Sequence, residues 1–317
     1  MKNLNISVVI PLYNKAPYIK RAIDSILKQS VHVDEIIVVD DGSTDGGWAI
    51  VEHLQNPLIT LIRQKNMGPT TARNVGIEKA KYELIAFLDA DDEWLPGYLQ
   101  EIYCLVSNFS DCGAYATSSL TVRPDCKVYY PDLSFVPPEP WIGIIPNIFT
   151  LLQHGLAFNS SSLVIQKSII GTIGWFPAWY YTGDIEFWIR IGVRYPIAFS
   201  PKRKVVYHQE ATNRTASTHN HLEIPPVVDS ISQMIENNTI ATGELRVEAQ
   251  EYIAKKVLTV AIQNILVGEK QKGIELLMKC NYTRKYKKTW LTWRVWSLLP
   301  QGLPKILLSI KEKVRGY

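Results

Sequence analysis

Residues 83–94 read "ELIAFLDADDEW", and this short stretch decides how the rest of the chain is interpreted. Leu84–Leu88 is a run of apolar residues, which predicts a short buried strand. Asp89, Asp91 and Asp92 follow at once, and like charges placed so close together repel one another. Two interpretations are open: a solvated turn, in which Asp is common, or a site where a divalent cation cancels the repulsion.

Upstream of this stretch the chain alternates between strand and helix patterns. Apolar, β-branched runs predict strands, and apolar residues at helical spacing predict helices. The predicted strands are Ile6–Ile10, Glu35–Val39, Leu58–Ile62 and Leu84–Leu88, and the helices between them are Tyr18–Gln29, Thr44 or Asp45 to Leu54, and Thr70 or Thr71 to Lys81. This order predicts an α/β fold with a mostly parallel central sheet and helices on both faces.

Polar residues follow three of the predicted strands. Pro11-Leu12-Tyr13-Asn14 comes after the first strand, Asp40-Asp41-Gly42-Ser43 after the second and Asp89-Ala90-Asp91-Asp92 after the fourth. The carboxyl ends of parallel strands meet at one edge of a sheet, where ligands bind. A solvated turn accounts for either acidic cluster alone, but it accounts less well for two clusters that converge on one edge.

The composition is that of a globular protein. The chain has 317 residues, of which 46% are hydrophobic and 20% charged. Its four cysteines show no CxxC spacing, which argues against a zinc site or a disulfide framework. The first residues become polar too early for a signal peptide, and no run reaches the roughly 20 apolar residues of a spanning helix. We therefore expect a cytoplasmic protein.

The C-terminal residues differ in charge from the rest of the chain. Residues 279–317 contain ten Lys or Arg and one acid, whereas the preceding residues contain 24 basic and 29 acidic residues. Trp290, Trp293 and Trp296 recur among these basic residues. The mixture is typical of a helix at an anionic membrane surface, and it also fits a helix that packs its tryptophans on the protein. We expect peripheral membrane contact through residues 284–317, at the inner face of the cell membrane. No recognition motif accompanies the charge, so we expect no nucleic-acid binding.

Past Trp94 the alternation becomes less regular. Strands are predicted at Gly113–Val122 and Ser161–Gln166, separated by a proline-rich connection, and a helix follows Asp184. From Ile224 to Met278 the periodicity is helical. We therefore predict two parts, an α/β domain over residues 1–220 and a helical region over residues 221–317.

Five segments resemble motifs of one enzyme family. They read "VVIPLYNKAPYI", "EIIVVDDGSTDG", "NMGPTTARNVGIEKA", "ELIAFLDADD" and "GDIEFWIRI", and their order and spacing are similar to those of family-2 glycosyltransferases. The resemblance covers about Asn5 to Arg214, or roughly two-thirds of the chain, and it implies the Rossmann-like GT-A fold. It assigns nucleotide-sugar binding to residues 1–95 and the acceptor side to residues 96–220, which makes residues 1–220 the catalytic domain.

The resemblance implies roles for the polar residues at the strand ends. Asp40, with Asp41 beside it, matches the aspartate that binds the base of the donor, and Pro11 and Tyr13 match the loop along the nucleoside. Asp89-Ala90-Asp91 matches the DxD motif, which binds the ribose and a divalent cation on the donor diphosphate. Magnesium and manganese both suit carboxylate and phosphate oxygens.

Each of the following residues or groups, which also match the family, can be interpreted in two ways. His208 matches a family histidine that contacts metal or diphosphate, although a single histidine is commonly structural. Arg73, with Asn74, matches a motif that either faces the donor or anchors its helix to the sheet. A group of aromatic residues either forms an acceptor platform or packs in the core: Trp175, Phe176, Trp179 and Tyr180.

An inverting transferase needs a base that removes the proton of the acceptor hydroxyl. Asp184 is the candidate, because it matches the second acid of the family's Glu-Asp motif. The first acid of that motif is replaced by Gly183, and Glu186 competes with Asp184 for the role. An N-cap of the following helix would place an aspartate at the same position.

The sequence therefore predicts an inverting, metal-dependent glycosyltransferase. It would move a sugar from a nucleotide diphosphate donor, by default a UDP-sugar, to a hydroxyl of a glycan or glycolipid in bacterial surface polysaccharide synthesis. Gly183 leaves open a non-catalytic relative that binds nucleotide sugar or acts as a scaffold. A sugar nucleotidylyltransferase is a weaker alternative, because it would require a glycine-rich basic loop where this chain has "PLYNKAPYI".

Overall fold

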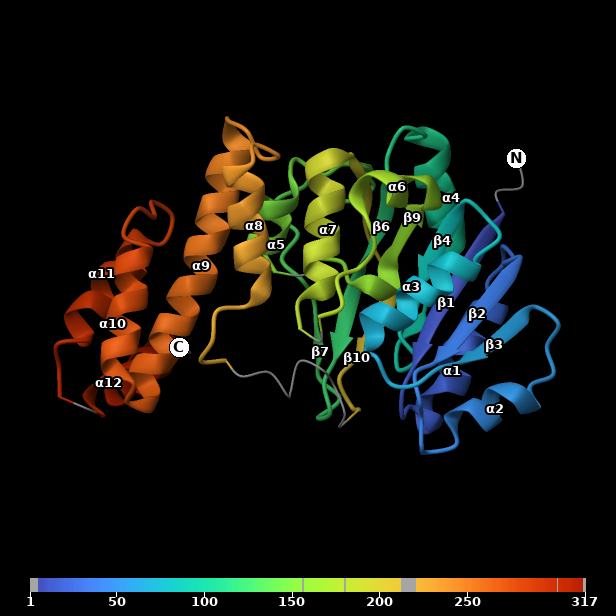
Figure 1. Cartoon of the computed structure of the whole chain (residues 1–317), viewed down its shortest axis with the longest axis horizontal. Coiled ribbons are helices and arrows are strands. Elements are labelled where there is room, and N and C mark those ends of the chain that lie inside the picture. The colour runs from blue at the N-terminus through green and yellow to red at the C-terminus, as the bar shows by residue number, and fades with distance from the viewer. Residues whose placement is uncertain (1–4, 156, 180, 212–220, 301, 316–317) are drawn as a thin grey trace. The chain divides into compact units, whose positions relative to one another are not determined.

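The computed structural model describes residues 5–155, 157–179, 181–211, 221–300 and 302–315. The chain divides into two compact units, residues 1–217 and 218–317. The first unit contains a ten-stranded sheet with helices, and the second is helical (Figure 1). The predicted fold class, an α/β domain followed by a helical C-terminal region, is confirmed.

Four parallel strands form the half of the sheet that the alternating pattern predicted. They are β1 (Ile6–Leu12), β2 (Glu35–Asp40), β3 (Ile59–Arg63) and β4 (Leu84–Phe87). β2 and β4 pair with the two sides of β1, and β3 pairs with β2. The carboxyl ends of these strands therefore meet at one edge of the sheet, where residues 11–14, 40–43 and 89–92 follow them.

The rest of the sheet mixes strand directions. β9 (Leu163–Gln166) runs antiparallel to both β4 and β6 (Ala114–Val122), and β6 runs parallel to β10 (Ile197–His208). Three short strands extend these pairs: β5 (Glu93–Trp94) and β8 (Gly143–Ile144) beside β10, and β7 (Val128–Tyr129) beside β6. Because β5 pairs with the end of β10, the chain that follows β4 lies next to His208.

Helices cover both faces of the sheet (Figure 1). Those of the first unit are α1 (Ala16–Leu27), α2 (Gly47–His53), α3 (Pro69–Lys79), α4 (Tyr98–Asn108), α5 (Ile148–Gln153), α6 (Ile170–Ile173) and α7 (Gly183–Arg194). Two 3₁₀ turns, Ser160–Ser162 and Lys167–Ile169, flank β9. The three helices predicted before residue 83 and the helix predicted after Asp184 are all present.

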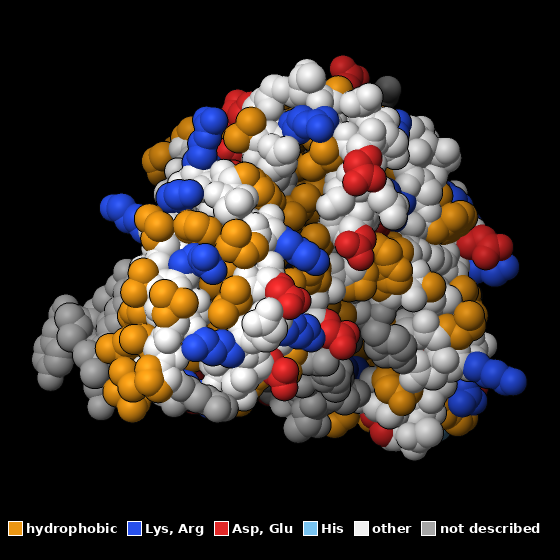
Figure 2. All heavy atoms as spheres, turned by 60° about the vertical axis from the view of Figure 1, so that its left-hand side comes forward, with side chains coloured by type: hydrophobic (Ala, Val, Ile, Leu, Met, Phe, Trp, Pro, Cys, Tyr) orange, Lys and Arg blue, Asp and Glu red, His pale blue; other side chains and the backbone are white. Residues whose placement is uncertain are grey.

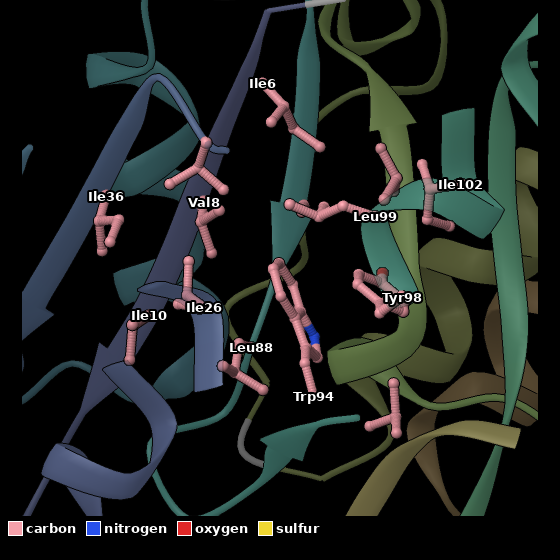
Figure 3. Packing of buried hydrophobic residues seen from close by; sticks show 14 of the residues in the cluster. Ile6, Val8, Ile10, Ile26, Ile36, Leu88, Trp94, Tyr98, Leu99 and Ile102 are labelled. Atoms are coloured by element: carbon pink, nitrogen blue, oxygen red, sulfur yellow. The ribbon is translucent and has the colours of Figure 1, made fainter. Parts of the chain in front are cut away.

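Alternate residues of β1 point to opposite layers of the domain. Ile6, Val8 and Ile10 are fully buried among side chains of α1, α4 and β4 (Figure 3). Each such side chain stabilises the fold by about 1.5–3 kcal/mol. Val9 faces α3 on the other side, where a Cβ at Gly76 would lie only 2.2 Å from Val9 Cγ1. The absence of a side chain at Gly76 therefore lets α3 lie directly against β1.

Two local predictions differ from the structure. Thr44 or Asp45 is predicted to cap α2, but Gly46 precedes the helix with a φ of 80°. Asp45 nevertheless accepts the N–H of Gly47 at 2.9 Å, which satisfies one donor at that end. Ser161 is predicted to lie in a strand, but it lies in the 3₁₀ turn before β9, because serine hydroxyls bond to nearby backbone and compete with strand pairing.

The second unit consists of α8 (Pro226–Glu236), α9 (Glu244–Val267), α10 (Lys270–Lys279), α11 (Lys287–Trp296) and α12 (Leu303–Arg315). Trp293 is buried in its core, and Trp290 donates its Nε1–H to the carbonyl of Leu277 at 2.7 Å. The tryptophans therefore pack within the helical unit itself. Across the described ranges, no helix combines the length and the apolar character needed to cross a membrane.

Candidate functional site

Asp41 holds the loop that leads into α3. Its carboxylate accepts the side-chain N–H of Gln64 at 2.7 Å and the backbone N–H groups of Met67 and Gly68 at 2.9 and 2.8 Å. Asp41 is buried, so these bonds offset the cost of removing its charge from water. Asp41 thus shapes the edge of the site, and both its oxygens already have partners.

Asp40 is the last residue of β2 and is fully buried. Its Oδ1 accepts the N–H of Ser43 at 3.0 Å, and its Oδ2 accepts the Nε–H of Arg63 at 3.1 Å. The Arg63 guanidinium in turn lies 4.3 Å from the centre of the Trp48 ring. These contacts fix the Asp40 carboxylate at the sheet edge.

Pro11 and Tyr13 lie at the same edge as Asp40. Pro11 is buried in β1, paired with Val39 of β2, and Leu12 pairs with Asp40. Tyr13 follows the strand and is 40% exposed, so part of its side chain lies at the surface of the site. The structure therefore brings together the residues that the resemblance assigns to the nucleoside.

Arg73 of α3 pairs with Asp89. Its Nη2 donates to Asp89 Oδ1, and its guanidinium lies 5.8 Å from the centre of the Phe176 ring. Its neighbour Asn74 forms two hydrogen bonds with the backbone of Phe176, at 2.9 and 3.0 Å. Arg73 therefore faces the acidic loop, and Asn74 holds the segment around Phe176.

Asp91 pairs with Lys15, which stands between β1 and α1. Lys15 Nζ lies 2.7 Å from Asp91 Oδ2, and the two side chains are only 12% and 13% exposed. The carbonyl of Asp91 accepts Nη2 of Arg21 at 2.6 Å. Two basic side chains from the same region therefore hold the residue.

Asp92 is buried beneath the loop. The Ser161 hydroxyl donates to its Oδ2, and the backbone N–H of His208 donates to its Oδ1 at 3.1 Å. Burial, together with the negative charges of Asp89 and Asp91, raises the pKa of Asp92 well above its usual value. The three aspartates of residues 89–92 thus have different partners: Arg73 pairs with Asp89, Lys15 pairs with Asp91, and Ser161 and the His208 backbone donate hydrogen bonds to Asp92.

His208 lies at the end of β10, half-buried next to this loop. Its Nε2 lies 3.4 Å from Glu93 Oε2. Burial lowers the pKa of His208, and the positive charge of Arg21 lowers it further. A neutral imidazole is therefore favoured at pH 7.

The arrangement of these residues does not fit a preformed metal centre. Carboxylate oxygens and a neutral imidazole are suitable ligands for manganese or magnesium. However, Asp89 and Asp91 are paired with Arg73 and Lys15, and the His208 ring faces Glu93. Within the described ranges, no group of three or more His, Cys, Asp or Glu side chains is placed to hold a metal ion.

Asp184 is the second residue of α7 and faces the same site. Thr182 precedes the helix, so Asp184 is not its N-cap, and its Oδ1 accepts the N–H of Ile185 at 2.8 Å. Burial raises the pKa of Asp184, the positive charge of Arg73 lowers it, and the negative charge of Asp89 raises it. The structure therefore brings Asp184, Arg73 and Asp89 within electrostatic range of one another.

Gly183 and Glu186, which lie close to Asp184 in the sequence, both have structural roles. A Cβ at Gly183 would lie 2.9 Å from Thr70 Cγ2 and 3.3 Å from the Pro177 carbonyl oxygen, so a larger residue would push α7 away from α3. Glu186 is buried and accepts Nε of Arg190 at 2.8 Å, and Arg190 also donates to the Trp175 carbonyl at 2.7 Å. Glu186 thus fixes the segment before α7.

The aromatic residues ahead of α7 divide between core and surface. Phe176 is buried and stacks on Phe187, with ring centres 3.7 Å apart. Trp175 is 46% exposed, and Trp179 is half-buried. Tyr180 lies outside the described residues. Trp175 and Trp179 are therefore the described members of this group that an acceptor can reach.

Sequence reasoning missed three residues that organise the acidic loop. Lys15 and Arg21 contact Asp91, and Ser161 contacts Asp92. Lys15 had a usable signal, because it follows the first strand at the carboxyl edge of the sheet. Arg21 and Ser161 gave no usable signal in the sequence, because the residues that they contact are 70 and 69 positions away in the chain.

Comparison with known sequences agrees with the motifs. Residues 7–127 match the family model described as Glycosyl transferase family 2. An uncharacterised glycosyltransferase of Nostoc sp. is 46% identical over 102 residues, which are 31% of this chain and 32% of that protein. The minor teichoic acid biosynthesis protein GgaA of Bacillus subtilis is 37% identical over 107 residues, covering 31% of this chain and 24% of GgaA. The aligned regions therefore span about a third or less of these relatives.

A longer match is more distant. An uncharacterised glycosyltransferase of Rickettsia prowazekii is 28% identical over 223 residues, which are 69% of this chain and 68% of that protein. The crystal structure of Staphylococcus aureus TarS 1-349 in complex with UDP-GlcNAc superimposes with a TM-score of 0.64 at 20% identity, covering 86% of this chain and 80% of that one. This likeness shows that the fold is shared. The match over residues 7–127 covers four of the five motifs and shows that this part of the chain is similar to glycosyl transferase family 2.

Proposed function

We propose that this protein is an inverting glycosyltransferase that uses a nucleotide diphosphate sugar. The observation that carries the proposal is the position of Asp184 beside the Arg73–Asp89 pair, with its pKa raised by burial. A carboxylate with a raised pKa is a better base for a hydroxyl proton than an ordinary aspartate. The adjoining arginine supplies positive charge where a donor diphosphate would bind.

The reaction that we propose is a single displacement. The acceptor hydroxyl oxygen attacks the anomeric carbon of the donor sugar, and the bond from that carbon to the diphosphate oxygen breaks. Asp184 takes the hydroxyl proton, and the diphosphate leaves with the bonding electrons. Arg73 stabilises the negative charge that develops on the leaving group.

For the donor we propose a UDP-sugar. Asp40, Pro11 and Tyr13 share one edge of the sheet, and Tyr13 is exposed there. The likeness to TarS, whose crystal structure contains UDP-GlcNAc, supports a uridine nucleotide. We propose that the reaction depends on magnesium or manganese, with Asp89, Asp91 and His208 as the candidate ligands. Each of these side chains would first have to leave its present partner, which is Arg73, Lys15 or Glu93 respectively.

For the acceptor we propose a hydroxyl of a glycan or a lipid-linked glycan in bacterial surface polysaccharide synthesis. The similarity to GgaA, a teichoic acid biosynthesis protein, supports this class. The exposed Trp175 lies shortly before α7 and offers a flat apolar face on which a sugar ring can stack. We propose that the acceptor binds on this side of Asp184.

We further propose that residues 284–317 contact the membrane surface from the cytoplasmic side. Leu291 and Val295 are 49% and 61% exposed and, four residues apart, share one side of α11, and Leu298, in the turn that follows the helix, is 73% exposed. Lys287 and Lys288 flank that side at the start of the helix. Figure 2 shows hydrophobic, basic and acidic side chains interspersed on the face that it displays. A bilayer with anionic headgroups suits the hydrophobic and the basic side chains.

Donor hydrolysis tests the proposed function. The protein is incubated with a panel of nucleotide sugars in the presence of manganese, of magnesium or of a chelator, and release of nucleoside diphosphate is measured. We expect slow release from one UDP-sugar, a large loss in Asp184→Asn with donor binding retained, and no loss in the surface control Asp111→Asn. Donor binding without turnover, unchanged by Asp184→Asn, would instead identify a non-catalytic relative. Binding of no donor under any condition would overturn the proposal.

A further inference from the structure

We propose that Lys15 is a built-in counter-ion that competes with a divalent cation for the carboxylate of Asp91. The ammonium group lies 2.7 Å from Asp91 Oδ2, where a metal bound to the same oxygen would have to be accommodated. Both side chains are largely shielded from water, with exposures of 12% and 13%, so this contact is screened less than a surface ion pair. The acidic loop therefore carries its own cation.

The backbone around Lys15 is fixed in the position that this contact needs. Asn14 has a φ of 50°, and its N–H donates to the Ser43 hydroxyl at 3.0 Å. Its side-chain oxygen accepts the N–H of Thr44 at 2.8 Å. Ala16 donates its N–H to Asp45 at 2.8 Å. The residues on both sides of Lys15 are thus tied to the loop after β2, and Lys15 projects from a held turn.

The other charged groups around the loop strengthen the same arrangement. Arg21 donates to the Asp91 carbonyl at 2.6 Å and to Glu210 at 2.7 Å, and Arg73 pairs with Asp89. A divalent cation that approaches Asp91 therefore meets the two basic side chains that contact this residue, Lys15 and Arg21, while Arg73 balances the charge of the neighbouring Asp89. A cation bound to Asp91 would repel an ammonium at this range, and both would share the negative charge of one carboxylate, so Lys15 at Asp91 opposes metal binding there.

Displacement of Lys15 would have a consequence for the donor. Its side chain is long and flexible, so the ammonium released from Asp91 stays beside the site and can pair with a phosphate oxygen instead. Lys15 would then exchange one anionic partner for another as metal and donor bind. This last step rests on the proposed function, whereas the competition between Lys15 and metal does not.

Manganese binding to the full-length, donor-free protein tests the competition. Free Mn²⁺ is measured by electron paramagnetic resonance during titration of wild type, Lys15→Met, the double variant Lys15→Met/Asp91→Asn and the control Lys20→Met. Lys20 also forms an ion pair of 2.7 Å, with Asp24, but is 60% exposed and outside the loop. We expect Lys15→Met to bind Mn²⁺ at least tenfold more tightly than wild type. The control should match wild type, and the double variant should lose the gain.

The inference is overturned if Lys15→Met folds normally by circular dichroism and thermal melting yet binds Mn²⁺ as wild type does. If Lys15→Met folds poorly, Lys15→Gln replaces it, because glutamine keeps a polar group without the charge. A tenfold gain that persists in the double variant would also overturn the inference, since the metal would then bind elsewhere. A gain that depends on Asp91 supports the competition even if no donor is hydrolysed, and in that case only the proposed function fails.

Discussion

Arg73 lies close enough to Asp184 to act on its ionisation. Burial raises the pKa of Asp184 above the usual 3.8, and the positive charge of Arg73 partly opposes this effect. The same arginine pairs with Asp89, whose negative charge raises the pKa of Asp184. One buried guanidinium thus connects the acidic loop after β4 with the first turn of α7, and its charge moderates the rise in pKa that burial causes in the proposed base.

Replacement of Arg73 by glutamine should move the pH profile of activity. The variant loses the charge that lowers the pKa of Asp184 and leaves Asp89 unpaired, so the pKa of Asp184 rises. We therefore expect the acidic limb of the kcat profile to shift to higher pH. Arg194→Gln, at the far end of α7, is the control and should leave the limb in place. An acidic limb that does not move in Arg73→Gln would show that Asp184 is not the titrating base.

Asp184→Asn should lower activity without lowering stability. Removal of a general base costs roughly 10²- to 10⁴-fold in rate. The raised pKa means that the folded state binds a proton more readily than the unfolded state, so the charge of Asp184 lowers stability as pH rises through the folded pKa. At pH 7 we expect the variant to melt at the same temperature as wild type or higher. A lower melting temperature would mean that Asp184 has a structural role.

Gly183→Ala should destabilise the contact between α7 and α3. The added Cβ would lie 2.9 Å from Thr70 Cγ2, and overpacking of this kind costs about 1–3 kcal/mol in the free energy of unfolding. Denaturant titration measures the loss. In a Thr70→Ser background the methyl group is gone while the hydroxyl that bonds the Trp179 carbonyl is kept, so the loss should shrink. An equal loss in both backgrounds would exclude Thr70 as the cause.

The two sides of α11 should respond differently to substitution. Val295→Ser and Leu298→Ser change exposed side chains, so we expect weaker sedimentation with anionic phosphatidylglycerol vesicles and an unchanged melting temperature. Trp293→Ala removes a buried side chain and should lower stability by about 3–5 kcal/mol. Val247→Ser, on α9, is the control for an exposed valine, which is 49% accessible. Unchanged vesicle binding in both Val295→Ser and Leu298→Ser would refute membrane contact through these exposed residues.

Much of the parallel half of the fold follows from local pattern. The runs at Ile6–Ile10 and Leu84–Leu88 are apolar over the length of a strand, and the segments between them repeat at helical spacing, so the order of elements is determined residue by residue. The polar residues that follow β1, β2 and β4 had to converge, because parallel strands end at the same edge. Five motifs added a resemblance to one enzyme family, and residues 7–127 match its family model.

What the sequence did not determine is which distant group each polar residue meets. Lys15 with Asp91, Ser161 with Asp92 and the close approach of Gly183 to Thr70 all join segments that no periodicity relates. The sequence also did not determine what the tryptophan-bearing side of α11 contacts, because an amphipathic helix can present an apolar side to a core or to a membrane. Periodicity fixes which residues share a face. Only the packing of whole elements, in which burial outweighs local preference, decides what that face touches.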